Sequence, residues 1–169
     1  VNNMLKHMSD SFNLLQSHRT DTPQVVIKSN LVADNKEFVI GVPRTSGINP
    51  ASKGNNMTII EDGFINCAIP AIDTHLDTTP ERLFVIDELG YLESSCIPFQ
   101  KAVEKLLDNS HVLAVIRKQS TEFLNRICNR KDVLVIDIDN TFETLSCIIM
   151  ASGMSKRCLL YTSPSPRDL

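Results

Sequence analysis

Three continuous apolar runs in the second half of the chain constrain the fold more than any other feature. They span Leu83 to Ile86, Val112 to Ile116 and Val133 to Ile138, of which the last contains Asp137 near its end, and each has the length of a short strand. Amphipathic helical patterns lie between and after them, at residues 98–107, 120–129 and 141–150. Buried strands separated by helices are typical of a parallel sheet that is covered on both faces. This half of the chain predicts an α/β fold with a mostly parallel sheet flanked by helices in three layers.

The first half of the chain has shorter and more mixed segments. Apolar residues recur at helical spacing over residues 3–18, which predicts a helix that ends before Pro23. Short β-branched or aromatic runs predict strands at residues 25–27, 38–40, 57–60 and 64–65. Asp62-Gly63 is expected to be a hairpin turn, and residues 69–76 are ambiguous, with a short helix as one interpretation.

Length and charge limit the classes of partner. The chain has 169 residues and a formal net charge of -3, which fits one domain and does not favour nucleic acid as a partner. No apolar run spans a bilayer and no signal peptide is visible, so no membrane association is expected. The five cysteines lack metal-ligand spacing and are interpreted as buried free thiols. These features together predict a cytoplasmic protein.

Acidic side chains follow the first of the three apolar runs. Asp87 and Glu88 come directly after it, and Glu93 lies close by. The carboxyl ends of parallel strands form the edge where ligands bind in such folds, and consecutive strand residues point to opposite faces. Gly90 is expected to permit a turn that other residues would find strained. An apolar run that ends in two acids is common by chance, so this motif alone is compatible with solvated acids at a strand end.

The order and spacing of three blocks resemble the small P-loop nucleoside-triphosphatase family. The blocks are Asp87-Glu88-Leu89-Gly90-Tyr91-Leu92-Glu93, then Phe99-Gln100-Lys101-Ala102-Val103, then residues 127–133 with Asn129-Arg130. The resemblance is clear over residues 82–140 and extends loosely back to Val25, where the family places a small antiparallel strand insert. It implies one incomplete P-loop domain over residues 1–157, with the insert at about residues 25–66 and a Walker B core at residues 82–150.

The resemblance also implies a chemistry for the acids. It predicts hydrolysis of the terminal phosphate of ATP- or GTP-type nucleotides with Mg²⁺. Asp87 is then the metal ligand, Glu88 the general base that orients and deprotonates water, and Glu93 a supporting acid. The family's glycine-rich loop ending in Gly-Lys-Thr is missing from the sequence. We therefore expect the chain to begin just after that loop and to hydrolyse nucleotide poorly by itself.

Other charged residues are candidates for binding the nucleotide. Arg117 follows the second apolar run and is a candidate contact for phosphate, although it also fits a solvated loop. The resemblance makes Arg130 a second candidate, although a cation at this position also fits a helix end. Asp137 and Asp139 are interpreted as exposed acids at a strand end, and the four histidines as surface residues.

Two alternatives remain open. Helper ATPases of DNA transposition share Asp-Glu-Leu-Gly-Tyr-Leu, but they should carry a basic surface, which a net charge of -3 does not favour. The second alternative is a non-catalytic α/β interaction module that lost its phosphate-binding loop.

The C-terminal residues have an unusual composition. Residues 158–168 can be back-translated into a transposase adapter used in preparing DNA libraries for sequencing. We therefore expect residues 158–169 to be a non-native tail, whereas a Pro/Ser-rich disordered segment is the alternative interpretation.

Overall fold

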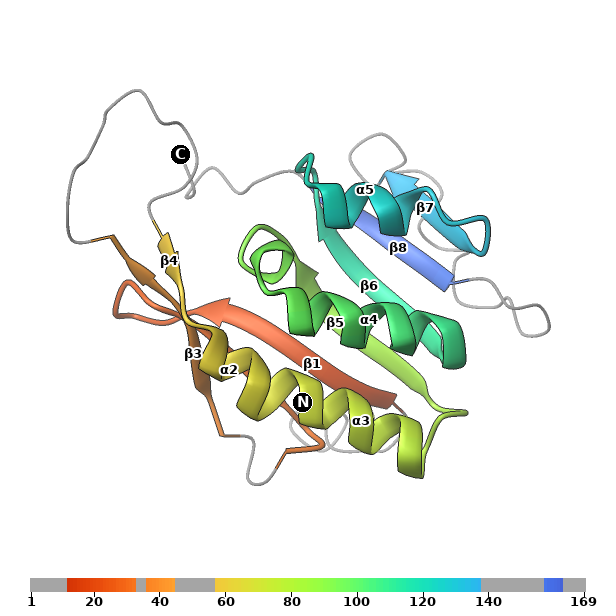
Figure 1. Cartoon of the computed structure of the whole chain (residues 1–169), viewed down its shortest axis with the longest axis horizontal. Coiled ribbons are helices and arrows are strands. Elements are labelled where there is room, and N and C mark those ends of the chain that lie inside the picture. The colour runs from red at the N-terminus through yellow and green to blue at the C-terminus, as the bar shows by residue number, and fades with distance from the viewer. Residues whose placement is uncertain (1–11, 33–35, 45–56, 138–156, 163–169) are drawn as a thin grey trace, which may run out of the picture.

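The computed structural model describes residues 12–32, 36–44 and 57–137, together with the backbone of residues 157–162. These residues form one eight-stranded sheet in the order β4-β3-β2-β1-β5-β6-β8-β7 (Figure 1). The strands are β1 (Phe12–Arg19), β2 (Val25–Ser29), β3 (Phe38–Pro43), β4 (Met57–Ile59), β5 (Leu83–Leu89), β6 (His111–Arg117), β7 (Val133–Asp137) and β8 (Arg157–Thr162).

Most of the sheet is parallel. Strand β5 pairs in parallel with β1 and with β6, and β8 pairs in parallel with β6 and with β7. Strands β2, β3 and β4 extend the sheet beyond β1 through antiparallel pairs. The predicted fold class is confirmed, including the small antiparallel insert. Because the parallel strands share one direction, their carboxyl ends lie on the same edge of the sheet.

The described helices lie over one face of the sheet. They are α2 (Glu61–Gly63), the π-helical turn η2 (Phe64–Ala68), α3 (Ile69–Thr78), the 3₁₀ turn η3 (Glu93–Ser95), α4 (Ile97–Asn109) and α5 (Glu122–Cys128). Helices α3, α4 and α5 cover the same face, side by side (Figure 1). The helix predicted at residues 141–150 lies outside the described residues.

The core lies between these helices and the sheet. Phe84 and Ile86 of β5 point into it and are fully or almost fully buried, whereas Leu83 is partly exposed. The predicted face of α4 is buried as expected, and its Phe99 ring lies 5.0 Å from the ring of Phe64 in η2. This alternation fixes which face of β5 turns toward the helices, because the strand must keep its large apolar side chains under them.

Residues 12–18 were predicted to be helical, and this prediction is wrong. They form strand β1, which pairs with β2 on one side and with β5 on the other. The apolar spacing fits a helix over the whole predicted segment, but Asn13 and Leu15 alternate in burial as strand residues do. Pairing with β5, about seventy residues away, overrides the local pattern.

The hairpin predicted at Asp62-Gly63 is also absent, because residues 61–78 are helical throughout. Phe64, Cys67 and Ala71 are buried at helical spacing. A Cβ at Gly63 would lie 2.3 Å from the backbone oxygen of Val39, so glycine allows the helix to approach β3 closely.

Residues 157–162 form β8 between β6 and β7, in a segment predicted to be largely a non-native tail. The origin of residues 158–169 stays a prediction, because a strand position does not reveal whether a segment is native. No described helix is long and apolar enough to cross a membrane.

Candidate functional site

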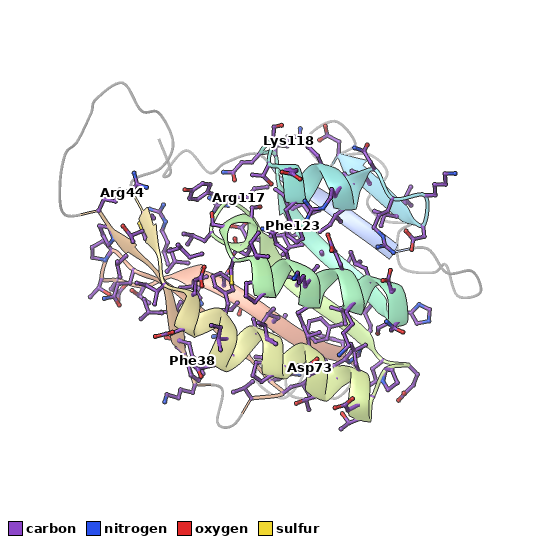
Figure 2. All side chains as sticks on the ribbon, viewed as in Figure 1. Phe38, Arg44, Asp73, Arg117, Lys118 and Phe123 are labelled. Carbon is purple, nitrogen blue, oxygen red and sulfur yellow. The ribbon has the colours of Figure 1, made fainter. Side chains whose placement is uncertain are left out.

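The predicted acids and one predicted arginine meet at the carboxyl edge of the parallel strands. Asp87 and Glu88 lie near the end of β5, and Arg117 is the last residue of β6. Figure 2 shows Arg117 and Lys118 together at this end of β6. Glu93 lies in η3, within the connection from β5 to α4. Four of the five predicted site residues are therefore brought to one edge.

Asp87 faces the neighbouring strand β1. Gln16 is its register partner there, and the side-chain amide of Gln16 donates a hydrogen bond to Asp87 Oδ2 at 3.2 Å. The Asp87 side chain is half-buried. Gln16 was missed by sequence analysis because its segment was predicted to be helical.

Glu88 faces the other neighbouring strand, β6. Its Oε1 accepts a hydrogen bond from Arg117 Nε in an ion pair. The register of β5 against β6 shifts between Asp87 and Leu89, so Glu88 has no partner in that ladder. The peptide bond between Asp87 and Glu88 is cis. The two consecutive acids thus contact different neighbouring strands, whereas the sequence prediction concerned opposite faces of the sheet.

Glu93 is buried, with 5% of its surface exposed. Ser17 Oγ donates to Glu93 Oε1 at 3.2 Å, and the Gly90 backbone N–H donates to Oε2 at 3.0 Å. Burial raises the pKa of Glu93, and the negative charge of Glu88 adds to this, while the backbone and Ser17 hydrogen bonds partly oppose it. Glu93 is therefore tied to the loop and to β1, and does not point freely into solvent.

Gly90 has a different role from the one predicted. Its φ lies outside the left-handed region, so no strained turn requires glycine. A Cβ at this position would instead lie 3.2 Å from Arg117 Cδ and 3.5 Å from Glu93 Oε2. Glycine therefore leaves room for the arginine stem beside the acidic loop.

Arg130 lies at the opposite edge of the sheet. It precedes β7, and its guanidinium contacts Asp132 at 2.9 and 3.0 Å and Asp108, near the end of α4, at 2.7 Å. The hydrogen bond to Asp132 is the main cause that raises the pKa of Arg130. The structure does not bring Arg130 to the other four residues. Asp137 ends β7 and pairs with Lys118 at 2.7 Å, while Asp139 lies outside the described residues.

The donor set at this edge fits a hard cation that keeps several of its waters. Mg²⁺ is typically bound through one or two carboxylates together with substrate phosphates. The described residues hold no group of three His, Cys, Asp or Glu side chains arranged for a metal. Asp87 offers a carboxylate that is half-buried and bonded through Oδ2 to a neutral amide, which leaves Oδ1 for a ligand. A single carboxylate of this kind is enough for a shared, substrate-dependent magnesium site.

Comparison with known proteins identifies a family that matches this chain. A family model described as NTPase matches residues 28–146, which is more than half of the chain. The chain belongs to this NTPase family. The match includes the strand that carries Asp87 and Glu88 and the strand that carries Arg117.

The curated relatives match only part of the chain. Nucleoside-triphosphatase THEP1 from a Thermotoga species (strain RQ2) is 38% identical over 58 residues, which are 34% of this chain and 33% of the relative. The protein of the same name from Thermotoga maritima is 36% identical over 58 residues with the same coverage. The chain thus spans about a third of the length of the curated relatives it matches.

A solved structure has a similar fold. The crystal structure of THEP1 from the hyperthermophile Aquifex aeolicus matches with a TM-score of 0.61. The alignment covers 99% of this chain and 84% of that one, at 13% sequence identity. At this identity the likeness shows the P-loop NTPase type of fold and nothing finer.

Proposed function

We propose that the chain carries the metal-binding and water-activating half of a nucleoside-triphosphatase site, which hydrolyses the terminal phosphate of ATP- or GTP-type nucleotides with Mg²⁺. The observation that supports this most directly is the convergence of Asp87, Glu88 and Arg117 at the carboxyl edge of two adjacent parallel strands. In open α/β sheets this edge is where ligands bind. Membership of the NTPase family supports nucleoside triphosphates as the substrate class proposed for this edge.

Asp87 is the proposed metal ligand. With Mg²⁺ held there, the site would supply positive charge against the charge that develops on the phosphate oxygens. Gln16 holds the Asp87 carboxylate from the β1 side through its amide at 3.2 Å, which fixes the carboxylate without adding charge.

Glu88 and Arg117 are proposed to act as a pair. A triphosphate brings oxygens that compete with Glu88 for the Arg117 guanidinium, since arginine binds phosphate and carboxylate with similar geometry. Arg117 then contacts the terminal phosphate, and the released Glu88 carboxylate accepts a proton from the attacking water. Both side chains are about a quarter exposed, so they can exchange partners without leaving a buried charge unpaired.

The phosphate cradle is proposed to come from a segment that these 169 residues do not include. The sequence contains no glycine-rich run that ends in Gly-Lys-Ser or Gly-Lys-Thr. Backbone N–H groups and a lysine in such a loop hold the phosphates in other P-loop proteins. We therefore expect the chain by itself to hydrolyse nucleotide much more slowly than a protein that also carries the loop.

The test replaces Glu88 by Gln in a protein that carries the loop. Glu88→Gln keeps the size and the hydrogen-bonding oxygen but removes the base, so kcat should fall by about 10²- to 10⁴-fold. Nucleotide affinity, measured by calorimetry, should be kept or increased, because Glu88 is not proposed to bind the nucleotide and a neutral glutamine competes less with phosphate for Arg117.

Asp108→Asn is the matched control. It also neutralises the carboxylate of an arginine ion pair, but at the opposite edge of the sheet, beside Arg130. It should leave kcat within about twofold. A Glu88→Gln variant with unchanged turnover would remove Glu88 from the mechanism, and a large loss in Asp108→Asn would show that the site extends to the other edge.

A further inference from the structure

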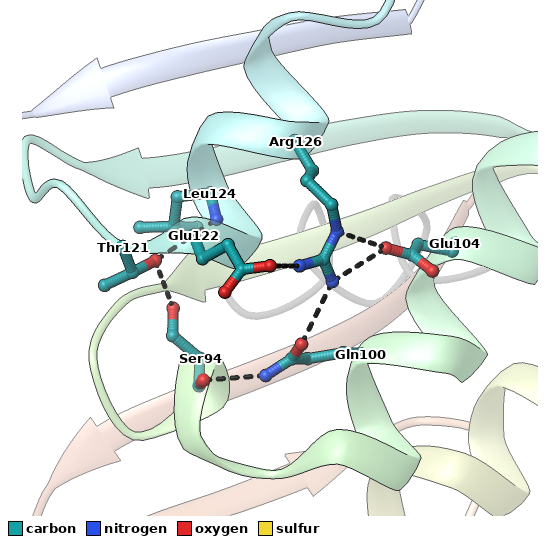
Figure 3. Close-up of polar contacts among 7 residues, drawn as sticks. All are labelled: Ser94, Gln100, Glu104, Thr121, Glu122, Leu124 and Arg126. Atoms are coloured by element: carbon teal, nitrogen blue, oxygen red, sulfur yellow. Dashed lines mark hydrogen bonds and ion pairs between the residues drawn. The ribbon is translucent and has the colours of Figure 1, made fainter.

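Two loops meet at the candidate site, and hydrogen bonds from side chains other than the proposed catalytic residues link them. One loop connects β5 to α4 and contains Gly90, Glu93 and Ser94. The other connects β6 to α5 and contains Thr121 as the N-cap of α5. Figure 3 shows Ser94 and Thr121 in contact between these elements.

A directed chain of hydrogen bonds runs through the two hydroxyl groups. The Leu124 backbone N–H donates to Thr121 Oγ1 at 3.1 Å, and Thr121 Oγ1 donates to Ser94 Oγ at 3.0 Å. Ser94 Oγ in turn donates to the Gly90 backbone oxygen at 2.6 Å. Each hydroxyl has one hydrogen to donate, so the order of the chain is fixed and each bond polarises the next.

A second connection runs through Gln100, which is 5% exposed. Its Nε2 donates to the Ser94 backbone oxygen at 2.7 Å, and its Oε1 accepts from Arg126 Nη2 at 3.2 Å (Figure 3). Only the nitrogen can donate and only the oxygen can accept, so both contacts depend on one orientation of the amide. Arg126 belongs to α5 and Gln100 to α4, so the helices behind the two loops are linked as well.

The contacts converge on the peptide groups of Gly90. Its carbonyl accepts from the N–H and the hydroxyl of Ser94, and its N–H donates to Glu93. Gly90 lies two residues after Glu88 and packs against the stem of Arg117. A shift of Gly90 would therefore move Glu88 relative to Arg117 and release Glu93.

We propose that Ser94 and Thr121 are positioning residues, which hold the loop of Glu88 and Glu93 against the loop that follows Arg117. This inference rests on the function proposed above for that site. Neither residue needs to touch the nucleotide. Their role is to set the separation of the two loops through one hydrogen bond between hydroxyl groups.

The experiment compares Ser94→Ala with Ser95→Ala. Both serines donate to the backbone oxygen four residues earlier, Ser94 at 2.6 Å and Ser95 to Tyr91 at 3.0 Å, but only Ser94 is also bonded to Thr121. In a protein that carries the phosphate loop, Ser94→Ala should lower kcat by about tenfold and change KM by less than about threefold. Ser95→Ala should leave both within about twofold.

Carboxyl NMR of the 169-residue chain gives a readout that does not depend on activity. Ser94→Ala should shift the titration of Glu93 and speed amide exchange of Gly90, because the Gly90 peptide loses its anchor. Thr121→Ser should preserve both signals, since it keeps the hydroxyl, and Thr121→Val should reproduce the effect of Ser94→Ala.

The outcomes separate the two proposals. If Ser94→Ala and Ser95→Ala behave alike in both readouts, the positioning role is wrong. If Glu93 and Gly90 respond to Ser94→Ala while the unsubstituted protein with its loop hydrolyses no nucleotide, the loop contact stands and the proposed function fails.

Discussion

Acidification should destabilise the fold through one buried histidine. His75 of α3 has no exposed surface and contacts Asn13 of β1 and Phe84 of β5, near the amino ends of these strands and away from the candidate site. Asn13 Nδ2 contacts His75 Nδ1 at 2.7 Å, and Ser110 Oγ contacts Nε2 at 2.6 Å. An amide nitrogen can only donate, so Nδ1 must be the acceptor and the proton of the neutral ring must lie on Nε2.

Protonation of His75 would place a second N–H against the Asn13 amide. Burial lowers the pKa of His75 below its usual 6.5, and the negative charge of Glu81 offsets this only in part. The unfolded chain, in which the ring is solvated, therefore binds the proton more readily than the folded protein. Stability contributed by neutral His75 is present above about pH 6.5 and is lost as the pH falls below it.

The magnitude follows from the two protonation equilibria. If the folded protein keeps His75 neutral, lowering the pH from about 7.5 to about 5.5 protonates only the unfolded state. With an unfolded pKa of 6.5, the loss is close to RT ln 10, or about 1.4 kcal/mol. Partial protonation of the folded state would make the loss smaller, so this value is an upper limit.

Urea unfolding at both pH values measures this difference. Other groups titrate in the same range, so the comparison is with His75→Gln, which retains a donor and an acceptor but does not titrate. The free energy of unfolding of the unsubstituted protein should fall by up to about 1.4 kcal/mol more than that of the variant over this pH range. Parallel pH dependence of the two proteins would refute the assignment of the effect to His75.

Two further predictions concern the helical segment that begins at residue 61. Gly63→Ala should destabilise the fold by about 2 kcal/mol in urea unfolding, because the clash with the Val39 oxygen outweighs a gain of about 1 kcal/mol in helix propensity. A variant of equal or greater stability would contradict the close approach of the helix to β3. Cys67 is fully buried and burial raises its pKa to about 11, so a thiol reagent should label Cys128 before Cys67, as mass spectrometry would show. Equal labelling rates would be inconsistent with this burial.

Long apolar runs made the parallel core predictable from sequence. The strands at Leu83, Val112 and Val133 begin within one residue of the predicted positions, and α4 presents the predicted face. An apolar run of this length has few alternatives to a strand in the core, because it has no polar face to expose. The position of Asp87 and Glu88 near the end of β5 followed from the same argument.

Side chains whose roles depend on distant partners were not predictable. Gln16 and Ser17 lie at the site only because β1 pairs with β5, and their segment has a helical pattern. His75 was interpreted as a surface residue, which is wrong, since its partners Asn13 and Ser110 are 62 and 35 residues away in the sequence. Thr121 caps α5, so the helix begins at Glu122, two residues after the predicted start, because Ser120 and Thr121 are both acceptable N-cap residues by type.

The strand order explains how two consecutive acids serve different contacts. Strand β5 lies between β1 and β6, so Asp87 reaches Gln16 on one side and Glu88 reaches Arg117 on the other. Neither Gln16 nor Arg117 lies close to the acids in the sequence, because both belong to neighbouring strands of the sheet. A change that displaced β1 or β6 would therefore separate the acids from these partners while leaving the sequence Asp87-Glu88 intact. The acidic motif indicates a site only together with the topology that supplies an amide to one acid and a guanidinium to the other.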